Sequence, residues 1–88
     1  MIFITLAKLR KKATKAVIAE TSRLLEQGIK EGGKVLGAYW ALGRYDVILI
    51  TEAKDEKTAM KWMLRTGDLL STETLVAVPR EEALKLVE

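Results

Sequence analysis

The stretch WALGRYDVILI, residues 40–50, constrains the fold more than any other part of this chain. Two apolar runs flank a short polar insert, and Gly43-Arg44 at its centre is a typical hairpin turn signal. The runs extend over 34–42 and 45–53, and both have the β-branched and aromatic composition of strands. We therefore predict two antiparallel strands joined by a tight turn.

Hydrophobic periodicity predicts the elements on either side of this hairpin. Asp55 is a good N-cap for the second helix and Gly67 can close it, while Pro79 ends the last strand. The predicted elements are a strand over 2–7, a helix over 12–31, strands over 34–42 and 45–53, a helix over 56–66, a strand over 71–78 and a short helix over 80–88. This β-α-β-β-α-β order with a short C-terminal helix is the ferredoxin-like arrangement of the α+β class, here as one domain over 1–88.

Both faces of the predicted hairpin carry large apolar side chains, because side chains alternate across a strand. One face holds Leu36, Ala38, Trp40, Val47 and Leu49; the other holds Val35, Gly37, Tyr39, Ala41, Ile48 and Ile50, with Asp46 and Glu52 at its ends. Two helices cover only one face of such a sheet. Burial of each large side chain is worth roughly 1.5–3 kcal/mol, so we expect a second copy to cover the other face in a homodimer.

The second helix has a wide apolar arc, comprising Ala59, Met60, Trp62, Met63 and Leu64. Such an arc exceeds what one core-facing stripe requires. Trp62 is interpreted either as a core residue or as part of a further contact between copies, since Trp is enriched at interface centres.

Composition excludes several classes of chemistry. The 88-residue chain contains neither Cys nor His, so disulfides, thiol nucleophiles, structural zinc and imidazole bases are all excluded. No cofactor and no metal site is expected.

The N-terminal apolar run is far shorter than the roughly 20 residues that span a bilayer. The basic residues come after this run, which is the reverse of the order in a secretory signal. We expect a cytoplasmic protein without membrane association.

The residues GGKVLGAYWALGRYDVILITEA and STETLVAV resemble the GYD domain family. Gly43, Tyr45 and Asp46 match the motif that names the family, and Thr72 and Thr74 fit its fourth strand. Together with the element order, the resemblance covers nearly the whole chain. It implies a ferredoxin-like fold of the dimeric α/β-barrel type, and it implies no established reaction.

The hairpin also has a looser similarity to the ligand-binding domain of Lrp/AsnC-type regulators, which place a related turn here. That similarity implies effector binding between subunits. The chain lacks a helix-turn-helix half, so it would act as a stand-alone effector domain, working as a homodimer or a higher ring.

A ligand site is predicted around the hairpin and the sheet face between subunits. Its candidate residues are Tyr39, Tyr45, Asp46, Arg44, Thr72 and Thr74. Small residues between polar ones can leave a pocket of the kind that ligands occupy. Each residue also has a structural interpretation: Asp46 as an acceptor of N–H groups in its own loop, Tyr45 as a packing residue, Arg44 as a solvated side chain, and the threonines as ordinary strand residues.

Two further functions remain open from the sequence. An enzyme resembling monooxygenases or isomerases of this fold would depend on Tyr39, Tyr45, Asp46, Glu52 and Glu73, although no catalytic spacing is evident and the pattern favours a binding role. RNA or anion binding would depend on the basic 8–15 segment: Lys8, Arg10, Lys11, Lys12 and Lys15. The central strands lack the exposed aromatic pattern of RNA-recognition domains, which does not favour a nucleic-acid partner.

Overall fold

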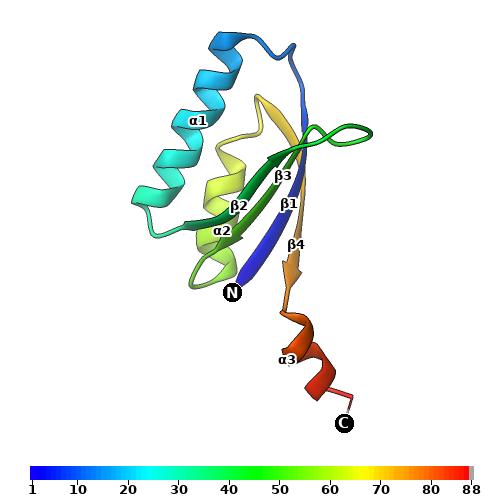
Figure 1. The fold of residues 1–88 in the computed structure, drawn as a ribbon. Helices are drawn as coiled ribbons and strands as arrows, with labels where there is room; N and C mark the ends of the chain where they lie inside the picture. Colours follow the sequence, from blue (N-terminus) through cyan, green and yellow to red (C-terminus); the bar gives the residue numbers. More distant parts are fainter. Residues whose placement is uncertain (88) are drawn as a thin grey trace.

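A four-stranded antiparallel sheet with two helices on one of its faces forms the body of the protein in the computed structural model, which describes residues 1–87 (Figure 1). The elements are β1 (Ile2–Leu9), α1 (Lys15–Lys30), β2 (Lys34–Trp40), β3 (Val47–Glu52), α2 (Glu56–Leu64), β4 (Leu70–Ala77) and α3 (Arg80–Lys85). The strands lie in the order β2-β3-β1-β4. The predicted ferredoxin-like order and the short C-terminal helix are confirmed.

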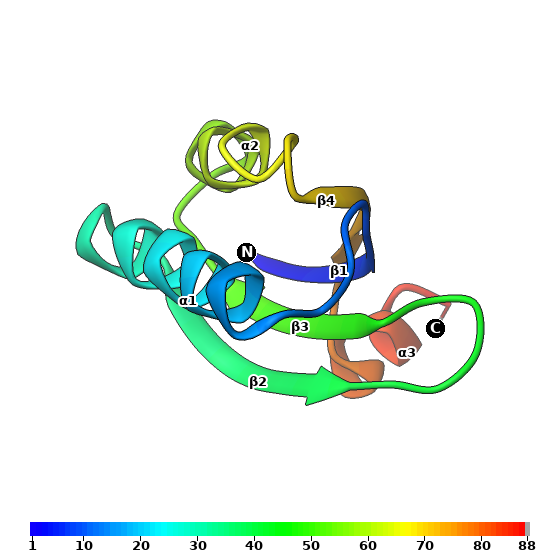
Figure 2. The same cartoon turned by 90° about the horizontal axis from the view of Figure 1, so that it is seen from above.

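The helices lie together on the same side of the curved sheet (Figure 2). In contrast, α3 follows Pro79 at the end of β4 and extends away from the sheet and from both other helices (Figure 1). Within residues 1–87, none of the helices combines the length and the hydrophobicity needed to span a bilayer.

Local hydrogen bonds place the helix ends inside the predicted ranges. The hydroxyl of Thr14 accepts the N–H of Val17, so α1 begins at Lys15 and not at residue 12. At the end of α2, the hydroxyl of Thr66 donates to the carbonyl of Met63 at 2.6 Å, and the helix ends at Leu64. Gly67 follows the end of α2 but does not adopt the left-handed conformation typical of a glycine at a helix end, because only Gly32 and Gly43 have positive φ within residues 1–87. The last helix ends at Lys85, and Glu88 of its predicted range lies outside the described residues.

Strand ends depart from the predicted ranges for similar reasons. The central strand β1 continues to Leu9 because it pairs with β4 along its whole length. The hairpin opens earlier than the apolar runs predict: the N–H of Ala41 donates to the carbonyl of Asp46 at 2.8 Å and closes a loop around Gly43. That loop shortens β2 and β3 relative to 34–42 and 45–53, and β4 is shifted by one residue relative to 71–78.

A β-bulge in β2 corrects the predicted faces of the hairpin. Val35 pairs with Thr51, yet Gly37 pairs with Ile50, so Leu36 is an extra residue in β2. Val35 therefore shares the face of Thr51, which is buried under the helices, and not the face of Tyr39 as simple alternation predicts. From Gly37 onward, the predicted alternation agrees with the observed pairing.

Trp62 of α2 fixes the packing of the helices. Its side chain is only 3% exposed, and its indole N–H donates to the carbonyl of Leu24 in α1 at 3.1 Å. The ring lies against the backbone at Gly28 and Gly33, where no side chain occupies the space. Trp62 is therefore a core residue, the first of its two interpretations.

We predict that Gly28→Ala destabilises the fold although alanine is the better helix former. A methyl group at residue 28 would overlap the Trp62 ring, and overpacking of this kind costs about 1–3 kcal/mol, more than the gain of about 1 kcal/mol in helix propensity. Urea unfolding would measure the loss. Gly67→Ala is the matched control, because its methyl would lie 3.6 Å from the nearest atom, the carbonyl oxygen of Leu64. Equal stability of the two variants would contradict the packing described here.

Glu31, at the C-terminal end of α1, links the two helices. Its carboxylate accepts a hydrogen bond from the Arg65 guanidinium at 2.6 Å and from the Gln27 amide at 2.8 Å, and Lys61 lies 3.7 Å away. These partners favour the charged form, above all Arg65, and lower the pKa of Glu31 from 4.5 to about 2.

This shift predicts how Glu31 contributes to stability as a function of pH. Because the folded pKa is depressed, the contribution is fully present above the unfolded value of 4.5 and is lost as pH falls towards about 2. Glu31→Gln should therefore lower the urea midpoint at pH 7, and the difference from the parent should shrink between pH 4.5 and pH 2. A difference that stays constant across this window would contradict the ion-pair role.

Candidate functional site

Asp46 ties the hairpin to the end of β1. Its Oδ2 accepts the backbone N–H of Leu9 at 2.8 Å, and its own N–H donates to the carbonyl of Ala7 at 2.8 Å. The structural interpretation of Asp46 expects donors in its own loop; the observed side-chain donor lies instead in β1, far along the sequence. Asp46 thus has a clear role in holding two strands together.

We predict that Asp46→Ala destabilises the protein by about 1–2 kcal/mol, because the Leu9 N–H would lose its acceptor in a partly buried place. Asp46→Asn keeps an acceptor oxygen and should lose less. Urea unfolding of both variants measures this difference. If both variants unfold like the parent, the carboxylate does not act through this hydrogen bond.

Tyr45 and Arg44 lie beside Asp46 in the same loop. The Tyr45 hydroxyl donates to the carboxylate of Glu73 in β4 at 3.2 Å. The Arg44 guanidinium carbon lies 5.9 Å from the centre of the Tyr45 ring, within the range of a cation–π interaction. The loop is therefore held to the far edge of the sheet by one exposed hydrogen bond.

Tyr39 lies on the sheet face without helices and is 59% exposed. Its ring lies over Gly37, where an added methyl group would come within 3.1 Å of a ring carbon. The small residue at 37 therefore makes room for Tyr39 itself, and the predicted pocket between Tyr39 and Asp46 is at least partly filled by this ring.

Thr72 and Thr74 lie on the opposite face. Thr72 pairs with Ala7 and Thr74 with Thr5, whose buried side chains point towards the helices. The hydroxyls of Thr74 and Thr5 are 3.0 Å apart and share a hydrogen bond. The structure therefore divides the predicted site residues: Tyr39 and the Tyr45–Glu73 pair belong to one face, and the two threonines to the other.

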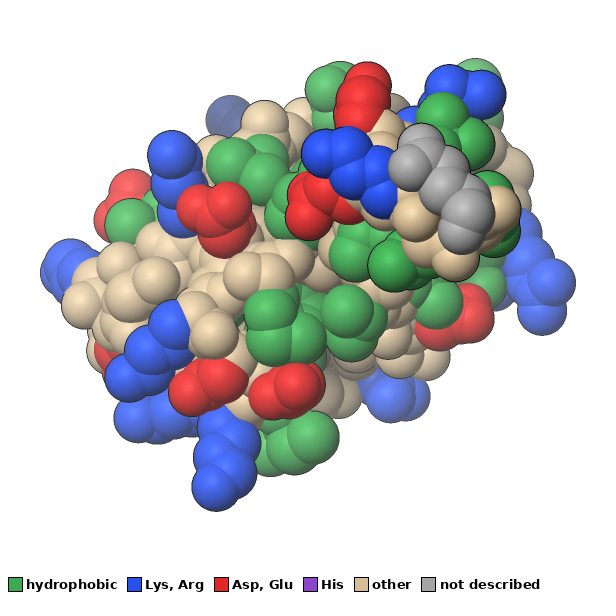
Figure 3. All heavy atoms as spheres, turned by 90° about the horizontal axis from the view of Figure 1, so that it is seen from below, with side chains coloured by type: hydrophobic (Ala, Val, Ile, Leu, Met, Phe, Trp, Pro, Cys, Tyr) green, Lys and Arg blue, Asp and Glu red, His purple; other side chains and the backbone are tan. Residues whose placement is uncertain are grey.

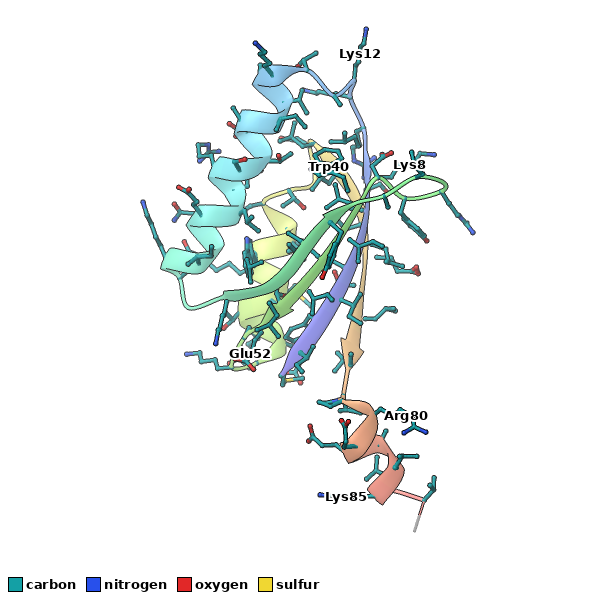
Figure 4. The ribbon with its side chains drawn as sticks, viewed as in Figure 1. Lys8, Lys12, Trp40, Glu52, Arg80 and Lys85 are labelled. Carbon is teal, nitrogen blue, oxygen red and sulfur yellow. The ribbon has the colours of Figure 1, made fainter. Side chains whose placement is uncertain are left out.

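The face without helices has an apolar centre, which we call the open face. Ile4 of the central strand β1 is paired with Ile50 on one side and with Leu75 on the other, and Leu6 is paired with Ile48. Leu75 is 46% exposed and the four others are half-buried in the single chain. Charged residues border this centre: Lys8 lies towards one end of the open face and Glu52 towards the other (Figure 4).

The C-terminal segment adds further exposed apolar side chains. Figure 3, which views the molecule from the end where α3 lies, shows hydrophobic side chains gathered around this helix. The exposed apolar residues of the segment are Val76, Val78, Leu84, Leu86 and Val87. The segment buries little against its own chain.

On the helix side, a cavity of about 250 Å³ lies between α1, α2 and the sheet. Its apolar walls come from both helices and from all four strands, and they include Ile18, Leu24, Leu49, Trp62, Met63 and Leu70. Trp40 points from the end of β2 towards the side of the sheet where α1 lies (Figure 4) and contributes to the lining. Sequence patterns do not predict this cavity, because its walls come from segments far apart in the chain. The local signal is Trp40, which follows the small Ala38 by two residues and shares its face of β2.

Acidic side chains do not converge. Asp46 binds the N–H of Leu9 at one end of the sheet, and Glu52 lies at the other end. Residues 1–87 contain no cluster of three acidic groups placed to hold a metal ion.

The five charged side chains of the basic 8–15 segment are exposed to solvent, and Lys12 points outward from the loop before α1 (Figure 4).

The fold and these surfaces define a small α+β domain with ferredoxin-like topology. The GYD domain model matches residues 3–87, and the chain belongs to the GYD domain family. No curated protein matches it. Among solved structures, the chain is similar to B. subtilis LrpC with a TM-score of 0.62 at 15% identity. The match covers 90% of this chain and 53% of LrpC, so the chain spans about half of that protein, and the likeness concerns the fold alone.

Proposed function

We propose that this protein is a homodimeric small-molecule-binding domain whose two copies pack sheet against sheet. The observation that carries the proposal is the apolar centre of the open face, formed by Ile4 and its neighbours in β3 and β4. Exposed apolar patches of this kind, when bordered by polar residues, are typical of interaction sites. A second copy is the simplest partner, because two molecules can bury the same uncovered apolar surface against each other.

The border of the open face supports this arrangement. Interface centres are depleted of charge while their rims are polar. Here Lys8, Glu52 and Glu73 surround the apolar residues without interrupting them. Tyr39 and the Tyr45–Glu73 pair lie at the same rim, so a second copy would approach the predicted hairpin residues as well.

The ligand-binding part of the proposal is supported by the apolar cavity between the helices and the sheet. The enzyme and nucleic-acid alternatives have weaker support. The titratable side chains named for catalysis are dispersed, and the basic segment is not joined by exposed aromatics on the central strands.

We predict that Ile4→Glu converts the dimer to a monomer. A carboxylate at the centre of an apolar interface would have to lose its hydration without a partner, which is strongly unfavourable. Sedimentation velocity at micromolar concentration should show a dimer for the parent and a monomer for the variant. Leu64→Glu is the matched control: Leu64 is 74% exposed on the outer side of α2, and its replacement should leave the dimer intact.

A parent protein that sediments as a folded monomer would overturn this proposal. A dimer that is lost in Leu64→Glu and retained in Ile4→Glu would assign the interface to α2 instead. Because Ile4 is only half-buried within its own chain, circular dichroism should show that the variant still folds.

A further inference from the structure

We propose that the helix-side cavity is the ligand site, and that its ligand is an uncharged, largely apolar molecule of about two fused rings with an N–H or O–H donor. This inference rests on the proposed small-molecule binding and places it on the face opposite the dimer interface. Of the hairpin residues, Tyr45 is outside the cavity lining and would not contact the ligand, whereas Tyr39 belongs to the lining although its pairing with Ile48 places its side chain on the open face.

The size of the cavity sets the size of the ligand. An apolar cavity of about 150 Å³ accommodates benzene, and ligand pockets commonly begin near 300 Å³. The cavity here measures about 250 Å³. A bicyclic molecule the size of indole therefore suits it better than a single ring or a nucleotide.

The lining sets the charge of the ligand. None of the residues that line the cavity is acidic or basic, and most of them are aliphatic or aromatic. A charged group inside would lose its hydration with no partner to compensate it. An uncharged ligand would instead contact the leucines and the faces of Trp40 and Trp62.

The hydroxyl groups of the lining favour a ligand that donates a hydrogen bond. Thr21 and Ser22 donate to the carbonyl of Ile18, at 2.6 Å and 3.1 Å, and Thr66 donates to the carbonyl of Met63. Each hydroxyl carries one proton and two acceptor lone pairs. Because these three protons are already committed to the backbone, Thr21, Ser22 and Thr66 offer the ligand acceptors.

The Tyr39 hydroxyl forms no hydrogen bond with residues 1–87 but belongs to a side chain of the open face; Thr72 provides the uncommitted hydroxyl on the helix side of the lining. Its side chain is exposed at the edge of the cavity and forms no hydrogen bond with residues 1–87. Trp40 and Ala38, which line the cavity from β2, are exposed as well. A ligand can therefore enter from solvent on the helix side of the sheet, along the row that runs from Trp40 at one edge to Thr72 at the other, and its polar group would meet Thr72.

Three probes built on a similar fused-ring skeleton test this assignment: indole, which has an N–H donor, benzofuran, which has none, and indole-2-carboxylate, which adds a charged group. We expect saturable binding of indole below about 1 mM, weaker binding of benzofuran, and binding of the carboxylate at least about tenfold weaker than that of indole. Calorimetry gives the affinities, and the NMR signals of the Trp40 and Trp62 indole groups report occupancy directly. Absence of saturable indole binding, or tighter binding of the carboxylate, would overturn the proposal.

Two variants locate the site. Thr72→Val removes the hydroxyl at constant shape and should weaken indole about fivefold while leaving benzofuran within about twofold. Ala38→Phe should fill the cavity from its exposed side and weaken both probes by more than about tenfold. Ala16→Phe, at an exposed position of α1 outside the lining, is the matched control and should bind both probes like the parent. Unchanged binding in Thr72→Val and Ala38→Phe would overturn the cavity assignment.

The same titrations separate this inference from the proposed dimer. Indole binding that persists in monomeric Ile4→Glu supports a site within one chain. Indole binding lost in Ile4→Glu but kept in Ala38→Phe would place the ligand at the sheet interface and overturn the cavity site while the dimer stands. A dimer that binds none of the probes refutes the cavity site alone.

Discussion

The contact of Trp62 with the glycines of α1 and the following turn is the interaction on which the rest of the structure depends. One large ring, buried and hydrogen-bonded to the carbonyl of Leu24, holds α2 against α1 at the level of Gly28 and Gly33. Glu31 strengthens the same end by bridging to Arg65. The two helices are therefore fastened at one end, and beyond Trp62 the space between them and the sheet contains the cavity.

The two faces of the sheet consequently have different environments. Phe3, Thr5 and Ala7 of β1 are buried beneath the helices, whereas Ile4 and Leu6 of the same strand are only half-buried. In our proposals the open face provides self-association and the helix side provides ligand binding. The two activities then depend on alternate residues of one strand, which allows them to be altered separately.

The hairpin illustrates how far the sequence predicts the site. Its position, its turn glycine and the face of Tyr39 follow from residue pattern, and they agree with the structure. The pattern does not reveal that Asp46 binds the N–H of Leu9, or that Tyr45 reaches Glu73, because those partners lie in β1 and β4. Simple alternation also does not predict the bulge at Leu36, and it therefore places Val35 on the wrong face.

The sequence by itself determined the element order, the family and the absence of thiol and imidazole chemistry, because strand and helix periods and residue types are local properties. Only the tertiary structure decided which predicted residues share a face, and it separated Thr72 and Thr74 from Tyr39. It also decided that a cavity exists. Cavities and faces arise from how distant segments pack, and packing distance is set by side chains such as Trp62 whose neighbours are not adjacent in the chain.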